Sequence, residues 1–186
     1  MKARRVQIFL LVGVLCASLM SIFAELSVGQ IYALKFVDVD GNTLSTADGR
    51  VTTVVLTTPA DVPKAESVGD RTPDYCLGNS NYRMITIVNF EKKRSAATRI
   101  VFRALMRRRL DAEAERLRSR YAARNIARDP RQDVHAVADF DGTLVSQLGM
   151  RFESADFRVF VFGQNGELLK QWNDVPSVDE LAAVVK

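Results

Sequence analysis

VTTVVLT, residues Val51–Thr57, and MITIVNF, residues Met84–Phe90, are the two stretches of sequence that decide the fold. Both are short, nearly all apolar and rich in β-branched residues, which is typical of strands buried on both faces of a sheet. Val134–Ala138 follows further along the chain and is predicted to be a third strand. Strands buried on both faces need helices to cover them, so the pattern predicts an α/β fold.

The segments between these strands differ in their capacity to form helices. Ser95–Ile126 contains neither glycine nor proline and is rich in Ala, Arg, Leu and Glu, which predicts one long helix. Its apolar residues at helical spacing can supply a buried face, namely Phe102, Met106, Leu110, Leu117 and Tyr121. Pro59–Asn79 is interrupted by prolines and glycines, and we expect only short helical turns in it.

The two ends of the folded region carry hairpin and capping signals. Leu34–Val39 reads as a strand that turns at Asp40, Gly41 and Asn42. Phe157–Phe162 and Leu168–Trp172 predict a hairpin, and Ser177 with Glu180 forms a capping box that opens a last helix, Val178–Val185. Strands alternating with helices indicate a mixed sheet with helices on both faces.

The amino terminus has the layout of an export signal. Met1–Arg5 holds three basic residues, and Val6–Ala24 is an apolar run without a charge. We therefore expect residues 1–24 to be a signal peptide or an N-terminal membrane anchor, and residues 25–186 to be one domain. The domain is then periplasmic or secreted, or anchored to the outer face of the cytoplasmic membrane. A composition of 47% hydrophobic and 26% charged residues with 2 cysteines excludes collagen-like, disordered and disulfide-dense classes.

The stretches FVDVDGNTLSTADGRVTTVVLTT, DFDGTLVSQLGM and FRVFVFGQNGELLKQW, with the capped last helix, resemble the thioredoxin-like superfamily. The resemblance is to exported redoxin domains related to TlpA and AhpC/TSA proteins, and more weakly to YtfJ-type periplasmic proteins. It implies a thioredoxin-like three-layer sandwich. It also implies a Cys-x-x-Cys pair or a peroxidatic cysteine at a helix N-terminus, but the matching stretch Thr57–Pro63 has no cysteine. The family's cis-proline is missing too, because Asp156 and Phe157 precede the matching strand.

One cysteine, Cys76, remains once residues 1–24 are set aside, so no intramolecular disulfide can form. The expected role of Cys76 is that of a small buried hydrophobe. The alternative is a thiol or peroxide oxidoreductase that uses Cys76 alone with an external thiol.

Two acidic motifs and one histidine are further candidates for chemistry. Asp139 and Asp141 lie in DFDGTL, which resembles the phosphotransfer motif of haloacid-dehalogenase-type hydrolases, although a strand-closing turn is the favoured interpretation. Asp38-Val39-Asp40-Gly41-Asn42 resembles the start of a calcium loop, but Gly49 stands at its twelfth position, which favours a plain turn. His135 has no Cys or His companion at metal-ligand spacing, so we expect a structural imidazole. No metal site and no cofactor is expected.

The long helix and its flanks are strongly basic. Residues 92–131 hold fourteen basic and four acidic side chains, a local charge of +10, which leaves −6 for the rest of a chain whose total is +4. Arginines four residues apart form stripes on one face, and these are our candidate partner-binding residues: Arg99, Arg103, Arg107, Arg116, Arg120, Arg124 and Arg128. We expect the last four to point to solvent with few carboxylates folded back on them.

The plainer interpretation of the basic helix is a solvated face with internal pairs such as Arg107 with Asp111 and Arg109 with Glu113. A net charge of this size also fits docking on an acidic protein or an anionic lipid surface. Nucleic acid is not an expected partner outside the cytoplasm.

The leading functional hypothesis is a redox-inactive binding or accessory module of the cell envelope. The exposure and the pKa of Cys76 test it best, because a buried, unperturbed thiol removes the oxidoreductase alternative. The alternatives are the single-cysteine oxidoreductase and, least favoured, a phosphoryl hydrolase using Asp139 and Asp141.

Overall fold

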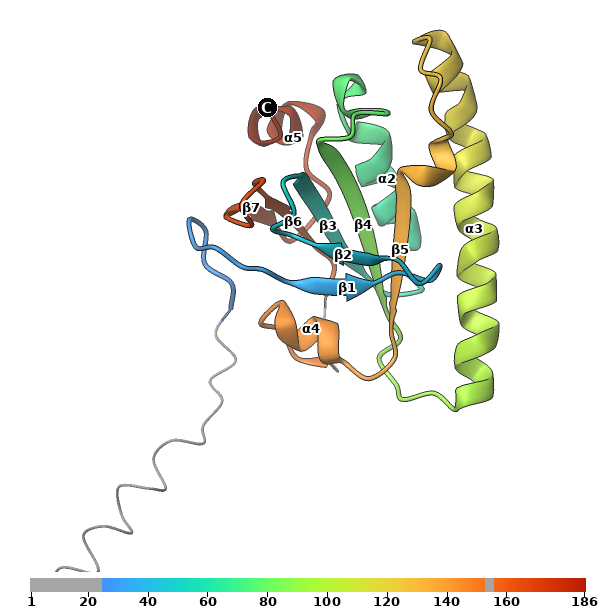
Figure 1. The fold of residues 1–186 in the computed structure, drawn as a ribbon. Coiled ribbons are helices and arrows are strands. Elements are labelled where there is room, and N and C mark those ends of the chain that lie inside the picture. The colour runs from blue at the N-terminus through green and yellow to red at the C-terminus, as the bar shows by residue number, and fades with distance from the viewer. Residues whose placement is uncertain (1–24, 153–155) are drawn as a thin grey trace, which may run out of the picture.

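The computed structural model describes residues 25–152 and 156–186. The predicted signal or anchor, residues 1–24, lies outside this part of the chain. A five-stranded mixed sheet forms the centre of the molecule (Figure 1). In spatial order its strands are β5 (Val134–Asp139), β4 (Tyr82–Asn89), β3 (Val51–Thr57), β6 (Arg158–Phe162) and β7 (Leu168–Trp172).

Strands β3, β4 and β5 run parallel, whereas β6 is antiparallel to β3 and β7 is antiparallel to β6. Val54 in the central strand is opposite Ile85 of β4 and Phe160 of β6, and all three side chains are buried. The runs Val51–Thr57 and Met84–Phe90 therefore lie in the inner strands β3 and β4, as predicted, whereas Val134–Ala138 lies in the edge strand β5.

A hairpin and a short helix cover one face of the sheet. The hairpin joins β1 (Lys35–Val37) to β2 (Thr43–Ser45), and the helix is α4 (Thr143–Gln147). Phe36, Leu44 and Val145 from these elements pack on alternate residues of the sheet, among them Ile87 and Phe162. Figure 1 shows both elements in front of the sheet.

Three helices cover the opposite face: α2 (Val62–Arg71), α5 (Val178–Val184) and the 28-residue α3 (Ala96–Ala123). Val68 of α2 and Leu181 of α5 share one apolar cluster with Val55 of β3. Met106 of α3 packs in another cluster with Ala136 of β5, near the sheet edge. The sheet is thus enclosed between two layers.

The predicted caps are present. The Ser95 hydroxyl accepts a hydrogen bond from the Thr98 backbone N–H and begins α3. The capping box of Ser177 and Glu180 begins α5, in which the two side chains each accept from the other's backbone N–H. The apolar face predicted for the long helix is only partly enclosed, because Met106 and Tyr121 are buried while Leu117 is half-exposed.

The expectation for Pro59–Asn79 was wrong, because this segment contains the ten-residue helix α2. Pro63 is the second residue of the helix, where the backbone N–H has no intrahelical acceptor and its loss costs nothing. Gly69 lies near the other end, and the helix stops only before Thr72 and Pro73. A 3-10 turn, η2 (Asp74–Cys76), then leads toward β4.

Candidate functional site

The junction between β3 and α2 is the place where the family resemblance implies reactive cysteines. Its side chains bond to one another instead. The Thr57 hydroxyl donates to the Thr58 carbonyl oxygen at 3.2 Å, and the Thr58 hydroxyl donates to Asp61 Oδ2 at 3.4 Å. Thr57 is fully buried. The junction therefore presents no thiol and no group able to exchange a disulfide.

Cys76 lies beyond the opposite end of α2, in η2. A ten-residue helix is about 15 Å long, so Cys76 is well removed from the β3–α2 junction. Its side chain is 6% exposed, and burial raises the pKa of the thiol to about 11. A thiol of this pKa is almost entirely protonated at neutral pH and is a poor nucleophile. Cys76 is thus a buried free thiol, and its burial is as expected.

Asp139 closes β5 and holds the start of α4. Its Oδ1 accepts a hydrogen bond from the Gly142 N–H at 2.9 Å, and its Oδ2 accepts from the N–H groups of Leu144 and Val145 at 3.1 and 2.9 Å. The residue is 2% exposed. Gly142 has a left-handed backbone with φ of 80°, and a Cβ there would lie 2.6 Å from the Phe152 ring.

This geometry confirms the turn interpretation of DFDGTL. A nucleophilic carboxylate must reach its substrate, whereas Asp139 is enclosed and saturated with backbone donors. Asp141 is exposed and accepts from the Thr143 hydroxyl and N–H, which lowers the pKa of its carboxyl. Both aspartates therefore act within the turn itself, as acceptors for backbone N–H groups and for the Thr143 hydroxyl.

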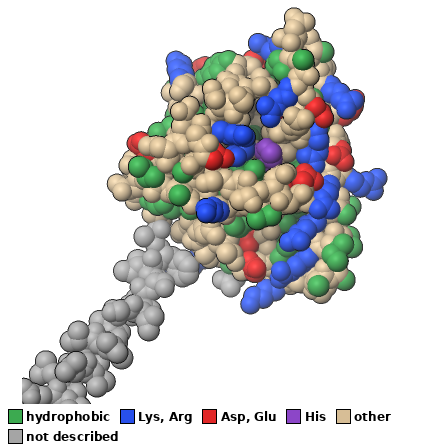
Figure 2. All heavy atoms as spheres, viewed as in Figure 1, with side chains coloured by type: hydrophobic (Ala, Val, Ile, Leu, Met, Phe, Trp, Pro, Cys, Tyr) green, Lys and Arg blue, Asp and Glu red, His purple; other side chains and the backbone are tan. Residues whose placement is uncertain are grey.

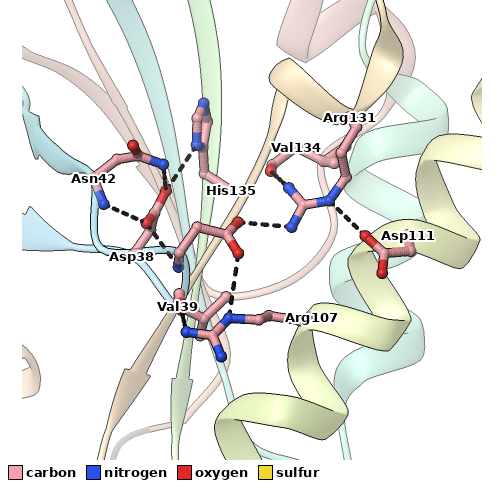
Figure 3. Close-up of polar contacts among 9 residues, drawn as sticks. Asp38, Val39, Asn42, Arg107, Asp111, Arg131, Val134 and His135 are labelled. Carbon is pink, nitrogen blue, oxygen red and sulfur yellow. Dashed lines mark hydrogen bonds and ion pairs between the residues drawn. The ribbon is translucent and has the colours of Figure 1, made fainter.

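Asp38 organises the turn between β1 and β2 (Figure 3). Its Oδ1 accepts from the backbone N–H groups of Asp40 and Asn42 at 3.0 and 2.8 Å. Its Oδ2 accepts from Asn42 Nδ2 at 3.0 Å and lies 3.2 Å from His135 Nδ1. The calcium-like pattern is therefore a turn, as favoured, and His135 is structural. Burial lowers the pKa of His135 despite the nearby Asp38 carboxylate.

A charged cluster ties this turn to the long helix. Asp40 lies 3.3 Å from Arg107 Nε and 2.6 Å from Arg131 Nη2, and Arg131 Nε also lies 2.8 Å from Asp111. Arg107 donates to the Val39 carbonyl oxygen as well. Figure 3 shows Arg107 and Asp111 reaching from α3, and Arg131 lying between them and the turn after β1. Arg107 is thus a packing residue here, and its predicted pairing with Asp111 is wrong because Arg131 takes that carboxylate.

The second half of α3 is also tied to the domain. Arg116 lies 3.4 Å from Asp70 and 3.0 Å from Glu113, which is the carboxylate we had assigned to Arg109. Three further ion pairs join the end of α3 and the residues after it to η2 and to the segment before β5: Arg120 with Asp74 at 2.9 Å, Arg124 with Asp74, and Arg128 with Asp133 at 2.9 Å. The expectation that Arg116, Arg120, Arg124 and Arg128 stand free of carboxylates is therefore wrong.

The first half of α3 and its approach differ from the second half. Within the described residues no ion pair is formed by seven cations, which we call the basic patch: Lys92, Lys93, Arg94, Arg99, Arg103, Arg108 and Arg109. The guanidinium groups of Arg99 and Arg103 lie over the Phe140 ring, 5.5 and 5.8 Å from its centroid. Ile100 and Val101 beside them are 69% and 58% exposed. In Figure 2 basic side chains gather along the edge of the molecule formed by α3.

No family model and no curated protein matches the sequence. Solved structures do match the fold. The exposed lipoprotein thioredoxin Etrx1 of Streptococcus pneumoniae strain TIGR4 is 15% identical, with a TM-score of 0.52 over 83% of this chain and 98% of that one. A peroxiredoxin-like protein from Aquifex aeolicus is 14% identical, with a TM-score of 0.51 over 88% of this chain and 90% of that one.

At these identities the likeness defines the fold, which is the thioredoxin-like α/β fold with a mixed five-stranded sheet. The predicted fold class is confirmed. The described part of the chain contains no helix long and apolar enough to cross a membrane. Across residues 25–152 and 156–186 no three His, Cys, Asp or Glu side chains gather in a way that could hold a metal ion.

Proposed function

We propose that this chain is a redox-inactive binding module of the cell envelope, built on the thioredoxin fold. The observation that carries the proposal is that the described residues present no accessible thiol. The β3–α2 junction holds threonines, a proline and an aspartate, and Cys76 is buried behind α2 with a raised pKa. Disulfide exchange needs an accessible thiolate and a second sulfur, and the folded domain offers neither. The envelope location is supported by the basic start and apolar run of residues 1–24.

The thiol proposal predicts that Cys76 is protected in the folded chain. The pKa of about 11 compares with an ordinary cysteine value of about 8.5, so at pH 8 alkylation by iodoacetamide is expected to be at least about 100-fold slower than in denaturant. Mass spectrometry of the Cys76 peptide measures the rate. The purified chain is also expected to leave insulin disulfides intact. Fast alkylation of the native chain, or a peroxidase activity that Cys76→Ser abolishes, would establish the single-cysteine oxidoreductase instead.

The partner of this module is, in our proposal, an anionic lipid surface that the basic patch contacts. The patch combines cations free of ion pairs with the exposed aliphatic side chains Ile100 and Val101. The charges alone would be enough to bind an acidic protein. An anionic lipid surface can bind the charges through its headgroups and the aliphatic side chains through the outer part of its acyl chains.

The docking proposal is tested with two matched double variants on the same helix. Replacing Arg99 and Arg103 by glutamine removes two free charges, and each is worth about 1 kcal/mol at an anionic surface, so affinity for phosphatidylglycerol vesicles is expected to fall about 30-fold. Arg116→Gln with Arg120→Gln changes the net charge equally but removes arginines already paired with Asp70 and Asp74, so its effect is expected to be small. Cosedimentation at low and high salt measures both.

An equal loss of vesicle affinity in the two double variants would show that binding depends on the net charge of the chain and not on the basic patch. Retention of full affinity by Arg99→Gln with Arg103→Gln would reject lipid docking and leave an acidic protein as the partner to seek.

A further inference from the structure

A groove runs between α2 and α3 over strand β4, with a cavity volume of about 490 Å³. We call it the α2–α3 groove. Its floor consists of alternate β4 residues, namely Tyr82, Met84, Thr86 and Val88. These side chains belong to the sheet face that α2 and α3 cover, but the two helices stand too far apart to enclose Met84 and Thr86, which remain half-exposed. Ligand cavities in proteins have volumes of about 300–1,000 Å³, so the groove is of the size of a binding site.

The lining of the α2–α3 groove is mostly apolar. Ala65 and Gly69 form part of the α2 wall, and Phe102, Leu105 and Leu117 form part of the α3 wall. Leu105 is 47% exposed at the lip. From Tyr82 to Val88 the floor is about 20 Å long, at about 3.3 Å per strand residue. The acyl chains of one bilayer leaflet span about 15 Å, half of the hydrocarbon core, so one chain fits lengthwise.

The charged side chains at the lip indicate the sign of the ligand. Arg108 and Arg109 line the groove on the α3 side and form no ion pair with any described residue. Three carboxylates also line the groove. Glu113 is bound to Arg116 and Asp133 to Arg128, while Glu66 on the α2 lip acts on Arg116. Arg108 and Arg109 thus line a mostly apolar channel without forming an ion pair with its carboxylates, which leaves both guanidinium groups available to an anionic head group.

We propose that the α2–α3 groove binds a single acyl chain of an anionic amphiphile, whose carboxylate or phosphate head is held by Arg108 and Arg109. Free fatty acid and membrane phospholipid share this chemistry and are the two sources of the ligand. The site goes beyond the proposed docking function. It shares Arg108 and Arg109 with the basic patch, but the test of docking changes Arg99 and Arg103, which do not line the groove, so the two proposals can fail separately.

The structure offers a variant that adds a side chain to the groove at a position where a Cβ meets no close contact. Gly69 lines the groove in a helical conformation, and a Cβ placed there meets only Met84, at 3.8 Å, which is ordinary van der Waals contact. Gly69→Leu thus adds a side chain to the groove and improves helix propensity at the same time. Ser67→Leu is the matched control, since it adds the same side chain to the same helix at a position that does not line the groove.

The experiment is a calorimetric titration of the full chain with dodecanoate and, separately, with dodecyltrimethylammonium, both below their micelle concentrations. Dodecanoate is expected to bind at one per chain, and at least tenfold more tightly than the cationic amphiphile. Gly69→Leu and the double variant Arg108→Gln with Arg109→Gln are each expected to weaken dodecanoate at least tenfold, while Ser67→Leu retains the original affinity. Thermal melting verifies that each variant is folded.

Undiminished dodecanoate binding by folded Gly69→Leu, or equal affinity for the two amphiphiles, would overturn the proposal. A dimer of the original chain that Gly69→Leu dissociates would assign the groove to contact between two copies and would also overturn it. Mass spectrometry of an organic extract from detergent-free protein then distinguishes free fatty acid from phospholipid as the source. Failure of vesicle docking with retention of dodecanoate binding would reject the docking proposal and leave the groove site standing.

Discussion

Replacing Asp139 by alanine is expected to lower the free energy of unfolding by about 4 kcal/mol. The buried carboxylate accepts from the N–H groups of Gly142 and Val145, both of which are enclosed with it. Each buried donor left without an acceptor costs about 1–3 kcal/mol, and two such donors are orphaned together. Since whole domains are stable by only about 5–15 kcal/mol, Asp139→Ala removes a large part of the total. Urea unfolding followed by circular dichroism measures the change.

Asp141→Ala is the matched control, because it lies in the same motif two residues away. Asp141 is exposed and accepts from Thr143 at the start of α4, so its loss is expected to cost about 1 kcal/mol, as for an ordinary helix cap. Asp139→Asn keeps one acceptor oxygen and is expected to fall between the two. Equal costs at Asp139 and Asp141 would show that the buried network does not hold the turn.

The strands and caps of this fold could be predicted from sequence because their signals are local. Val51–Thr57 is an uninterrupted β-branched run, and Ser177 with Glu180 is a pattern whose two hydrogen bonds are made within four residues. The DFDGTL turn was likewise readable, since Gly142 and the aspartates have fixed places in it. Helix α2 was missed because proline and glycine were counted as breaks without regard to their positions in the helix.

The pairing of the arginines could not be predicted, because it depends on which segments meet in three dimensions. Asp70 and Asp74 are about fifty residues from the arginines that they bind, and nothing in the helix sequence marks Arg116 or Arg120 as paired and Arg99 or Arg103 as free. The α2–α3 groove was missed for the same reason. Met84 and Thr86 read as core positions of a buried strand, but the spacing of two helices leaves them partly open.

Replacing Asp48 by alanine is expected to destabilise the domain by about 3–5 kcal/mol, and by more than the replacement of its partner, Arg83→Met. The Arg83 guanidinium is enclosed, with its side chain 2% exposed, while the Asp48 side chain is 33% exposed. Both Oδ atoms of Asp48 accept from Arg83, at 2.9 and 3.1 Å, and the Thr52 hydroxyl and Ser45 carbonyl accept the remaining bonds. Removing Asp48 leaves the buried Arg83 cation without an anion, and an unpaired buried charge costs much more stability than an unpaired exposed one.

Removing Arg83 instead leaves a carboxylate that water can reach, and methionine fills much of the space of the arginine stem. The cost of Arg83→Met is therefore expected to be about 2 kcal/mol, mostly from the Thr52 and Ser45 acceptors that lose their donor. Chemical denaturation of both single variants and of the double variant measures the difference between the two costs. The double variant is expected to be about as stable as Arg83→Met, because it no longer holds a buried cation without an anion. A larger loss for Arg83→Met than for Asp48→Ala would mean that the guanidinium packs the β2–β4 contact and that its burial, not its neutralisation, is what the domain requires.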